Sequence, residues 1–427
     1  MIGEIIFAGS TLTFAADTAT CGRPDAISAR QITTPNATSR IFINTPSSLI
    51  ACSDLARTRE LETVDTTLEE MVPRKCFSRF SVKSILPAFH LMPDLHLTEA
   101  DVRRLLHPAE LCSALEAAFR DRYPSICLPP RTHVELAHGI FLAMSCYDGA
   151  AGTLGMKLVL VRDRDQIRDQ DVSGPNHNSA LAEGRIQATY LLLDPETAQP
   201  RLTIAANYLT DLRTAATSAV ATKFLARSDA STLGIFGTGR LALAHLAVLP
   251  LARNFDRVLV CGRNSARSAA FVRKISAQLP DLTITAVDAR TCAAQSDVIC
   301  TCTSNSAPLF DGHDLRPGTH LNLVGAFRPQ TREVDTHTIK RSRIVVDTYT
   351  TAAEVGELLI PLQEGVIARD HVVADLHELI TGKKQGRHSP EDITAFKSVG
   401  CALEDLVAAE LLLEEKKVED ASPLKKR

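Results

Sequence analysis

The chain has 427 residues, of which 45% are apolar and 23% are charged, as is typical of globular proteins with two or three domains. Its 47 Lys and Arg residues are balanced by 50 Asp and Glu residues, so a strongly basic nucleic-acid-binding surface is not expected. No apolar run reaches the ~18 residues of a membrane span. The 11 cysteines are scattered without a Cys-x-x-Cys pair, which indicates reduced thiols and no metal site. We therefore expect a cytoplasmic protein that binds neither nucleic acid nor membranes.

The first 91 residues are rich in Ser and Thr and show no sustained helical or strand period. We expect 1–91 to be a poorly ordered leader, and Met92 resembles a natural start, which would make the leader a gene-model extension. After it, Thr98 and Asp101 form a variant capping box at the start of a helix. Four short apolar runs and a helical segment follow, which predicts strands of one sheet or barrel and then a helix. The predicted strands lie at 139–146, 155–162, 188–194 and 202–206, and the helix at 210–225.

The next part of the chain alternates short apolar runs with helical segments. Strands spaced in this way predict a parallel, doubly wound sheet, and therefore an α/β fold. The segment 389–413 has helical composition again, and 414–427 is predicted to be a charged, solvated tail. The predicted strands of the parallel sheet are 232–236, 257–261, 282–287, 297–302, 320–326 and 343–347.

A glycine-rich turn follows the first of these strands. Gly237, Gly239 and Ala242 form a Gly-x-Gly-x-x-Ala pattern, with Thr238 and Arg240 between them. The first glycine permits a tight turn, the second lets the backbone approach a pyrophosphate, and Ala242 keeps the helix close to the sheet. The strand before it and the helix after it provide the context that a dinucleotide site requires. The alternative is a purely structural glycine turn.

The end of the second strand distinguishes the two nicotinamide dinucleotides. NAD-binding proteins place an acid there, which contacts the ribose 2′-hydroxyl. Here the strand ends in Cys-Gly-Arg-Asn, with Arg263 and Asn264 in place of an acid. A guanidinium can pair with a 2′-phosphate, so the sequence favours NADPH over NADH. The alternative is that Arg263 is only a solvated loop residue.

A lysine and two arginines mark a candidate substrate site. Lys157 lies within an apolar strand, where its ammonium needs an anionic partner or a lowered pKa. Arg131 and Arg213 could each grip a carboxylate bidentately. The alternatives are a lysine that reaches solvent at the strand edge and arginines in surface ion pairs.

These motifs together resemble the ornithine cyclodeaminase/μ-crystallin family over roughly residues 95–413. The family-like segments are Pro-Pro-Arg at 129–131, Gly-Met-Lys at 155–157, Leu-Thr-Asp-Leu-Arg-Thr-Ala-Ala at 209–216, the turn at 237–242, Cys-Thr-Ser at 302–304, Asn-Leu-Val-Gly-Ala at 322–326, Arg-Glu-Val-Asp at 332–335 and Phe-Lys-Ser-Val-Gly at 396–400.

The resemblance implies a Rossmann domain inserted in an α+β substrate and dimerisation domain, and a homodimer. The expected boundaries are 92–213 for the first part of the substrate domain, 214–385 for the Rossmann domain and 386–413 for a returning helix. The resemblance also implies that Arg131 and Arg213 bind a substrate carboxylate and that Lys157 contacts the substrate or transfers a proton. The residues that it implies along the cofactor are Thr303, Ser304, Val324, Gly325, Ser398 and Val399.

One position departs from the cyclodeaminases of this family. They place an Asp soon after the Val-Gly of the fifth strand, and this chain has Phe327 there. A phenyl ring cannot bind an ammonium group or transfer a proton. We therefore expect an NAD(P)H-dependent reductase of a small α-imino acid, cyclic ones included. The alternatives are an ornithine cyclodeaminase and a protein that binds NADPH and a small ligand with little turnover.

Overall fold

The structure is a computed structural model, and it describes residues 2–7, 10–15, 95–162, 186–352 and 354–421. Near the N-terminus, β1 (Ile2–Phe7) and β2 (Ser10–Ala15) pair as an antiparallel hairpin. The rest of the expected leader at 1–91 lies outside the described residues, as does the end of the tail at 422–427.

The described residues from Leu95 onward form two sheets. The larger described sheet is parallel throughout, with the order β11-β10-β9-β12-β13-β16-β14-β15. The chain runs outward from β9 through β10 to β11 and then returns to β12, so the strand order reverses between β9 and β12. In a doubly wound sheet this reversal leaves a crevice at the carboxyl ends of the strands. The expected Rossmann fold is confirmed. Its strands are β9 (Thr232–Phe236), β10 (Arg257–Cys261), β11 (Thr283–Ala286), β12 (Val298–Thr301), β13 (His320–Leu323), β14 (Ser342–Val346), β15 (Val372–Asp375) and β16 (Ile393–Lys397).

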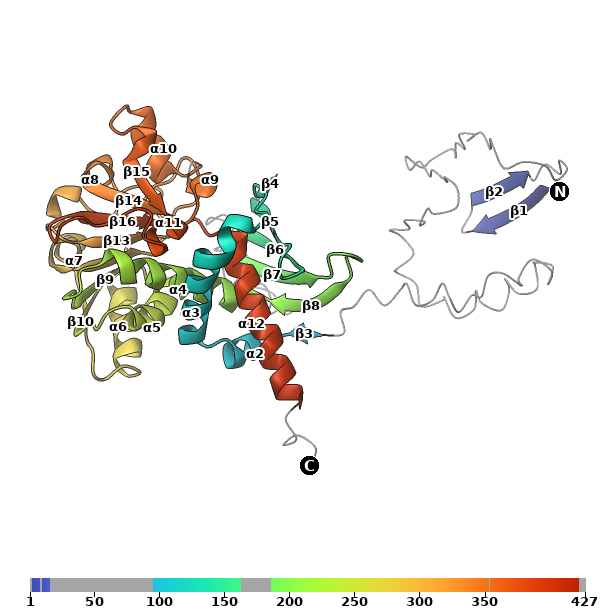
Figure 1. The fold of residues 1–427 in the computed structure, drawn as a ribbon, viewed down its shortest axis with the longest axis horizontal. Coiled ribbons are helices and arrows are strands. Elements are labelled where there is room, and N and C mark those ends of the chain that lie inside the picture. The colour runs from blue at the N-terminus through green and yellow to red at the C-terminus, as the bar shows by residue number, and fades with distance from the viewer. Residues whose placement is uncertain (1, 8–9, 16–94, 163–185, 353, 422–427) are drawn as a thin grey trace. The chain divides into compact units, whose positions relative to one another are not determined.

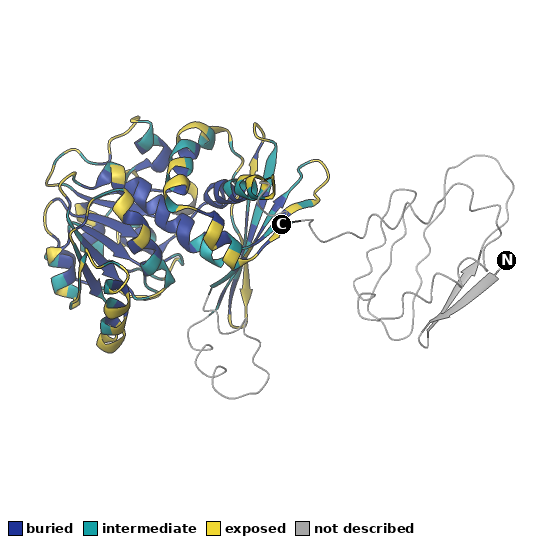
Figure 2. Cartoon of the chain, turned by 90° about the horizontal axis from the view of Figure 1, so that it is seen from below, coloured by how far each residue is buried: buried dark blue, intermediate teal, exposed yellow. Residues whose placement is uncertain are grey.

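Helices link these strands, as the alternation of the sequence predicts. The central strands are buried on both faces, which is why their sequences are continuous apolar runs (Figure 2). No helix in the described part of the chain is long and apolar enough to cross a membrane. The helices are α5 (Arg240–Val248), α6 (Ser265–Ser276), α7 (Ala289–Gln295), α8 (Thr336–Arg341), α9 (Tyr349–Ala352), α10 (Gly356–Gln363) and α11 (Leu376–Ile380).

The second sheet has the order β3-β8-β7-β6-β5-β4, antiparallel except for the β3–β8 pair. One of its faces carries α12 (Ala402–Ala421), which contacts β5, β6 and β7. The expected capping box at Thr98 is present at the start of α2 (Glu99–Leu105). Further elements are α3 (Pro108–Ala117), β3 (His96–Leu97), β4 (Thr132–Leu136), β5 (Gly139–Asp148), β6 (Thr153–Arg162), β7 (Ile186–Leu193) and β8 (Pro200–Ala205).

The long helix α4 (Asn207–Leu225) joins the two sheets (Figure 1). It contacts β7 of the smaller sheet and the neighbouring helices α3 and α12. It also contacts β13 and β16 of the Rossmann sheet and the helix α5. Most of its residues are buried, so polar side chains on it face protein or a cavity rather than bulk water. Arg213 lies in the middle of this helix.

The C-terminal segment differs from the expectation. Part of 386–413 forms β16, which lies between β13 and β14 in the parallel sheet, and α12 begins only at Ala402. The short run Ile-Thr-Ala-Phe-Lys is bounded by Gly400, whose φ of +84° ends the strand before the helix. The predicted tail also begins later, because α12 continues to Ala421.

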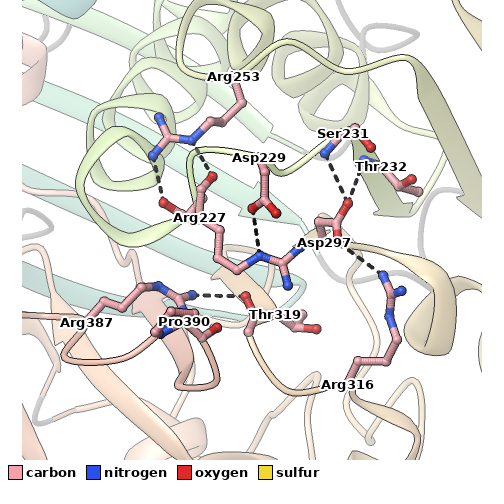
Figure 3. A network of polar contacts seen from close by, with 12 residues as sticks. Arg227, Asp229, Ser231, Thr232, Arg253, Asp297, Arg316, Thr319, Arg387 and Pro390 are labelled. Atoms are coloured by element: carbon pink, nitrogen blue, oxygen red, sulfur yellow. Dashed lines mark hydrogen bonds and ion pairs between the residues drawn. The ribbon is translucent and has the colours of Figure 1, made fainter.

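A cluster of arginines lies at the amino ends of the parallel strands of the Rossmann sheet, opposite the carboxyl ends (Figure 3). Asp297, just before β12, accepts hydrogen bonds from the backbone of Thr232 at 3.0 Å and from Arg227 and Arg316 at 3.1 Å each. Arg253 donates to three backbone carbonyls around the end of α4. These guanidinium groups already have hydrogen-bond partners within the protein. We therefore infer that the cluster stabilises the fold rather than binds a ligand.

Candidate active site

The β9–α5 turn has the geometry of a phosphate-binding loop. Gly237 has a φ of +121°, and a Cβ there would lie 2.6 Å from the carbonyl oxygen of Cys302. Gly239 is the N-cap of α5, and a Cβ there would meet no atom within 4 Å. Ala242 is fully buried against the sheet. The amino end of α5 therefore presents backbone N–H groups to an open space, which suits an anion.

That open space is a cavity of about 1000 Å³. It is lined by Gly237, Thr238 and Gly239 of the turn and by Arg263 and Asn264 after β10. Asn264 also caps α6, since its Oδ1 accepts a hydrogen bond from the backbone of Arg267 at 2.9 Å. The cavity suits a dinucleotide in size and in the chemistry of its walls.

A second cavity of about 380 Å³ adjoins the first. Gly239, Cys302, Thr303 and Ser304 line both cavities, so the two form one cleft along the carboxyl ends of the strands. The structure thus brings most of the residues predicted from the sequence to one place. The predicted residues along the second cavity are Arg131, Lys157, Arg213, Gly239, Arg240, Thr303, Ser304, Val324, Gly325, Ser398 and Val399. Their roles remain predictions.

Lys157 lies on the inner face of β6 and is 1% exposed. Strand alternation places it on the same side as Val159 and Val161, which also line the cavity. Its Nζ lies 2.8 Å from Oδ2 of Asp405, on α12. Burial, and then the nearby Arg213, lower the pKa of Lys157 to about 8, although Asp405 opposes the shift. An ammonium with such a pKa can release its proton near neutral pH.

Arg213 is held by the same helix. Its Nη1 lies 2.6 Å from Oε2 of Glu404, and its Nε lies 3.0 Å from Oδ1 of Asp405. The second contact is an ion pair without good hydrogen-bond alignment. Burial lowers the pKa of Arg213, but Asp405 and Glu404 outweigh it and raise the pKa above its usual value. Arg213 is therefore a fixed positive charge at the wall of the cavity.

Arg131 is less fully paired. Its Nη1 donates to the carbonyl of Val399 at 3.4 Å, and its buried Nε has no hydrogen-bond partner among the described residues. Burial lowers its pKa. The hydroxyl oxygen of Ser398, in the same cavity, is likewise buried without a partner among the described residues. Buried polar atoms left unpaired are costly, so both atoms indicate the place of a polar ligand.

Carboxylates accompany the cations of the cavity. Arg131, Lys157 and Arg213 are cationic, and Glu404 and Asp405 are anionic. A further cavity residue, Arg240, is balanced by Asp211, whose Oδ2 lies 2.9 Å from its Nε. Lys157, Arg213 and Arg240 therefore each have a carboxylate beside them.

The acids of this site were not predicted from the sequence. Glu404 and Asp405 lie about 250 positions after Lys157, and nothing local connects them with it. The available signal is two adjacent acids in the first turn of the helix, with apolar residues on both sides of them in the sequence. Asp211 was also missed, although burial raises its pKa to about 6. Asp211 lies within the family-like segment 209–216, but the sequence analysis assigned no role to it.

Comparisons with known proteins agree with this geometry. The family model described as "Ornithine cyclodeaminase/mu-crystallin family" matches residues 93–420. A Delta(1)-pyrroline-2-carboxylate reductase of Bacillus cereus is 35% identical over 239 residues, which are 56% of this chain and 73% of that protein.

Two solved structures are similar in fold and sequence. The first is Thermococcus litoralis Delta(1)-pyrroline-2-carboxylate reductase in complex with NADH and L-proline, with a TM-score of 0.70 and 32% identity; the match covers 76% of this chain and 98% of that one. An archaeal alanine dehydrogenase dimer with bound NAD has a TM-score of 0.69 and 29% identity; this match covers 78% of this chain and 98% of that one. From the extent of the family match and the motifs that line the cleft, we conclude that this chain belongs to the ornithine cyclodeaminase/μ-crystallin family.

Proposed function

We propose that this protein is an NAD(P)H-dependent oxidoreductase that reduces a small cyclic α-imino acid, such as pyrroline-2-carboxylate, to the amino acid. The observation that carries the proposal is the shared cleft: the dinucleotide turn and the cationic cavity meet at Gly239, Thr303 and Ser304. The pyrroline-2-carboxylate reductases among its relatives support the choice of substrate class.

Three cations of the cavity have a role in this reaction. Arg131 and Arg213 bind the substrate carboxylate, Arg131 through donors that no described residue satisfies. Lys157 holds its proton toward the C=N nitrogen and gives it up as that nitrogen becomes an amine. A bound reduced nicotinamide supplies the hydride for the carbon of the C=N bond. The apolar walls, with Val159 and Val161 among them, limit water around the reacting atoms.

Phe327 favours reduction over cyclodeamination. Its half-buried ring lines the substrate cavity, at the position where the sequence predicts an acid in a cyclodeaminase. The wall that it forms is apolar and has no carboxylate to pair with an ammonium group or to accept its proton. A flat ring such as a cyclic imine fits against such a wall.

A preference for NADPH is part of the proposal. Arg263 is exposed at the rim of the larger cavity, beside the amino end of α6. The carboxylate that does line this cavity, Asp288, follows β11 instead of β10, and it caps α7 through Thr291. The related structures contain NADH or NAD, so the preference rests on Arg263.

We also propose a homodimer, which is how the related archaeal alanine dehydrogenase is described. The outer face of the smaller sheet supports it: Phe141, Leu158, Leu160 and Leu191 point away from the buried face and are only half buried. The strand register places Phe141 opposite Leu160. The expected cytoplasmic location stays a prediction.

The test of the proposed function is a survey of cofactor oxidation by the full chain. NADPH and NADH are each offered with pyrroline-2-carboxylate, piperideine-2-carboxylate and open-chain imino acids. We expect rapid NADPH oxidation with a cyclic substrate. Release of ammonia and proline from ornithine would instead identify a cyclodeaminase, and bound NADPH without turnover would identify a binding protein.

Lys157→Met tests the assigned proton donor within the same survey. The reduction rate should fall by about 10²- to 10⁴-fold, since a general acid is lost. The dissociation constant for NADPH should change by less than about threefold. Because the change leaves Asp405 without its lysine, thermal unfolding must be measured as well, and Lys157→Met combined with Asp405→Asn restores the charge balance.

A further inference from the structure

Glu333 is a buried carboxylate directly behind the wall of the cleft. It is fully buried and accepts hydrogen bonds from the backbone N–H of Thr303 at 2.8 Å, from the Thr303 hydroxyl at 2.6 Å and from the backbone N–H of Gly325 at 2.7 Å. All three partners donate. Donated hydrogen bonds favour the ionised form of a carboxylate.

These contacts join two loops of the site. Thr303 follows β12, Gly325 follows β13, and both residues line the substrate cavity. The fit is close, since a Cβ on Gly325 would lie 2.6 Å from Oε1 of Glu333. Glu333 therefore fixes the two loops at the centre of the cleft.

The surroundings of Glu333 do not neutralise it. Glu357, also fully buried, accepts the backbone N–H of Glu333 at 2.9 Å, and Lys397 lies 3.3 Å from Oε2 of Glu357. Lys397 also donates to the carbonyls of Ala326 at 2.6 Å and Leu323 at 3.2 Å. This buried cluster thus contains two carboxyl groups and one amino group, and the amino group lies beside Glu357. Burial and then Glu357 raise the pKa of Glu333, while its hydrogen bond with Thr303 and the charge of Lys397 oppose the shift.

We propose that Glu333 is a positioning residue whose charge also makes the cleft bind the oxidised nicotinamide cofactor more tightly, relative to the reduced one, than a neutral side chain would. The oxidised ring carries one positive charge and the reduced ring carries none. A buried carboxylate attracts that charge strongly, because little solvent screens it. The inference rests on the proposed function, in which the nicotinamide lies where the two cavities meet, beside Thr303. The same charge favours hydride donation on the protein, since the ring becomes cationic as the hydride passes to the imine carbon.

The experiment compares dissociation constants for NADP⁺ and NADPH, measured by calorimetric titration of the full chain. In Glu333→Gln the loops lose a carboxylate acceptor, so both affinities should fall. The NADP⁺ affinity should fall by about tenfold more than the NADPH affinity, because only the oxidised ring loses a charge partner. Thr303→Val is the matched control: it removes one hydrogen bond to Glu333 without a change of charge, so the ratio of the two constants should stay constant.

Lys397→Met should change the ratio of the two dissociation constants in the opposite direction. It removes the positive charge of the cluster, so the affinity for NADP⁺ should rise relative to that for NADPH. A loosened loop would not reverse the sign in this way, and this variant decides the matter if Glu333→Gln does not fold. An unchanged ratio in Glu333→Gln would overturn the inference and leave the proposed function intact. A wild-type chain that binds neither cofactor would overturn both.

Discussion

Lys157 and Arg213 are two cations buried side by side, an arrangement that is costly unless acids accompany it. Asp405 contacts both side chains and Glu404 contacts the arginine, so α12 supplies the counter-charges. The lysine keeps a pKa of about 8, while the arginine stays charged at any ordinary pH. We therefore propose that Arg213 holds an anion and that Lys157 exchanges a proton.

The pH dependence of imine reduction should follow Lys157. The reaction needs its protonated form, which is lost as the pH rises through about 8, so kcat/KM for reduction should decline above that pH. Oxidation of the amino acid needs the neutral lysine and should accelerate over the same range. Steady-state rates between pH 6 and about 10 in both directions measure this.

Asp405→Asn provides the control for that profile. Asp405 opposes the lowering of the lysine pKa, so its neutralisation should move the decline to a lower pH. The titration of the substrate itself is the same for both proteins. A decline at the same pH in the two would show that another group titrates.

Arg263→Ala should separate the two dinucleotides. Loss of the guanidinium should weaken NADPH binding by about tenfold or more and leave NADH binding nearly unchanged, because only NADPH has a 2′-phosphate to lose. Fluorescence titration at fixed ionic strength measures both. Arg273→Ala, an exposed arginine later on α6, serves as the matched control and should change neither constant. Equal weakening of both cofactors would remove the basis for the NADPH preference.

The sequence indicated the cations of the site but not their counter-ions. Lys157 stands out because a lysine within an apolar strand is unusual on any fold, and Arg213 stands out through the motif around it. The acids Glu404 and Asp405 come after all the strands of the Rossmann sheet in the sequence, and they contact these cations only in the folded chain. Contacts of that range depend on tertiary packing, which no local pattern encodes.

Among the elements, the β9–α5 turn shows how one motif separates folding from binding. Gly237 is required by the chain itself, given its φ of +121° and the closeness of the Cys302 carbonyl. Gly239 has an extended conformation that any residue can adopt, and its missing side chain leaves open space beside α5. The first glycine therefore serves the fold, and we infer that the second serves a ligand.

Alanine at each glycine should separate these two roles. Gly237→Ala should destabilise the protein by about 2 kcal/mol through backbone strain, which appears as a lower midpoint of thermal unfolding. Gly239→Ala should leave that midpoint nearly unchanged and weaken NADPH binding by about tenfold or more, because the new methyl group occupies the approach of the pyrophosphate. If Gly239→Ala bound NADPH normally, the turn would not hold the cofactor.

The elements that the sequence placed well are those with strong local patterns. The strands β9 and β10 have the bounds expected from their apolar runs, 232–236 and 257–261. The strand β16 was missed because its five residues stand next to a long helical segment and contain a lysine. Lys397 is tolerated there because Ala326, Leu323 and Glu357 satisfy its ammonium.

At the scale of the whole molecule, two sheets share one cleft because α4 packs against both. The smaller sheet contributes Lys157, and the Rossmann sheet contributes the glycine turn and Thr303. The helix α12 contributes the acids Glu404 and Asp405. The fold class was predictable from the alternation of strands and helices. The meeting of the two cavities was not, because it depends on the position of one sheet relative to the other.

The outer face of the smaller sheet predicts the oligomeric state. Leu158→Glu introduces a charge among half-buried apolar side chains and should convert a dimer into a monomer in sedimentation velocity. Lys274→Glu, an exposed change on α6, is the control and should leave the sedimentation coefficient unchanged. A wild-type protein that sediments as a monomer would contradict the proposed dimer.

The central claim is that a hydride passes within this cleft to the carbon of a cyclic imine. The direct measurement uses NADPH deuterated at both C4 positions of the nicotinamide, with pyrroline-2-carboxylate as the acceptor and mass spectrometry of the product. We predict proline with one deuterium at Cα, formed in equal amount to the cofactor consumed. Proline without deuterium, or cofactor oxidation without proline, would contradict this hydride transfer.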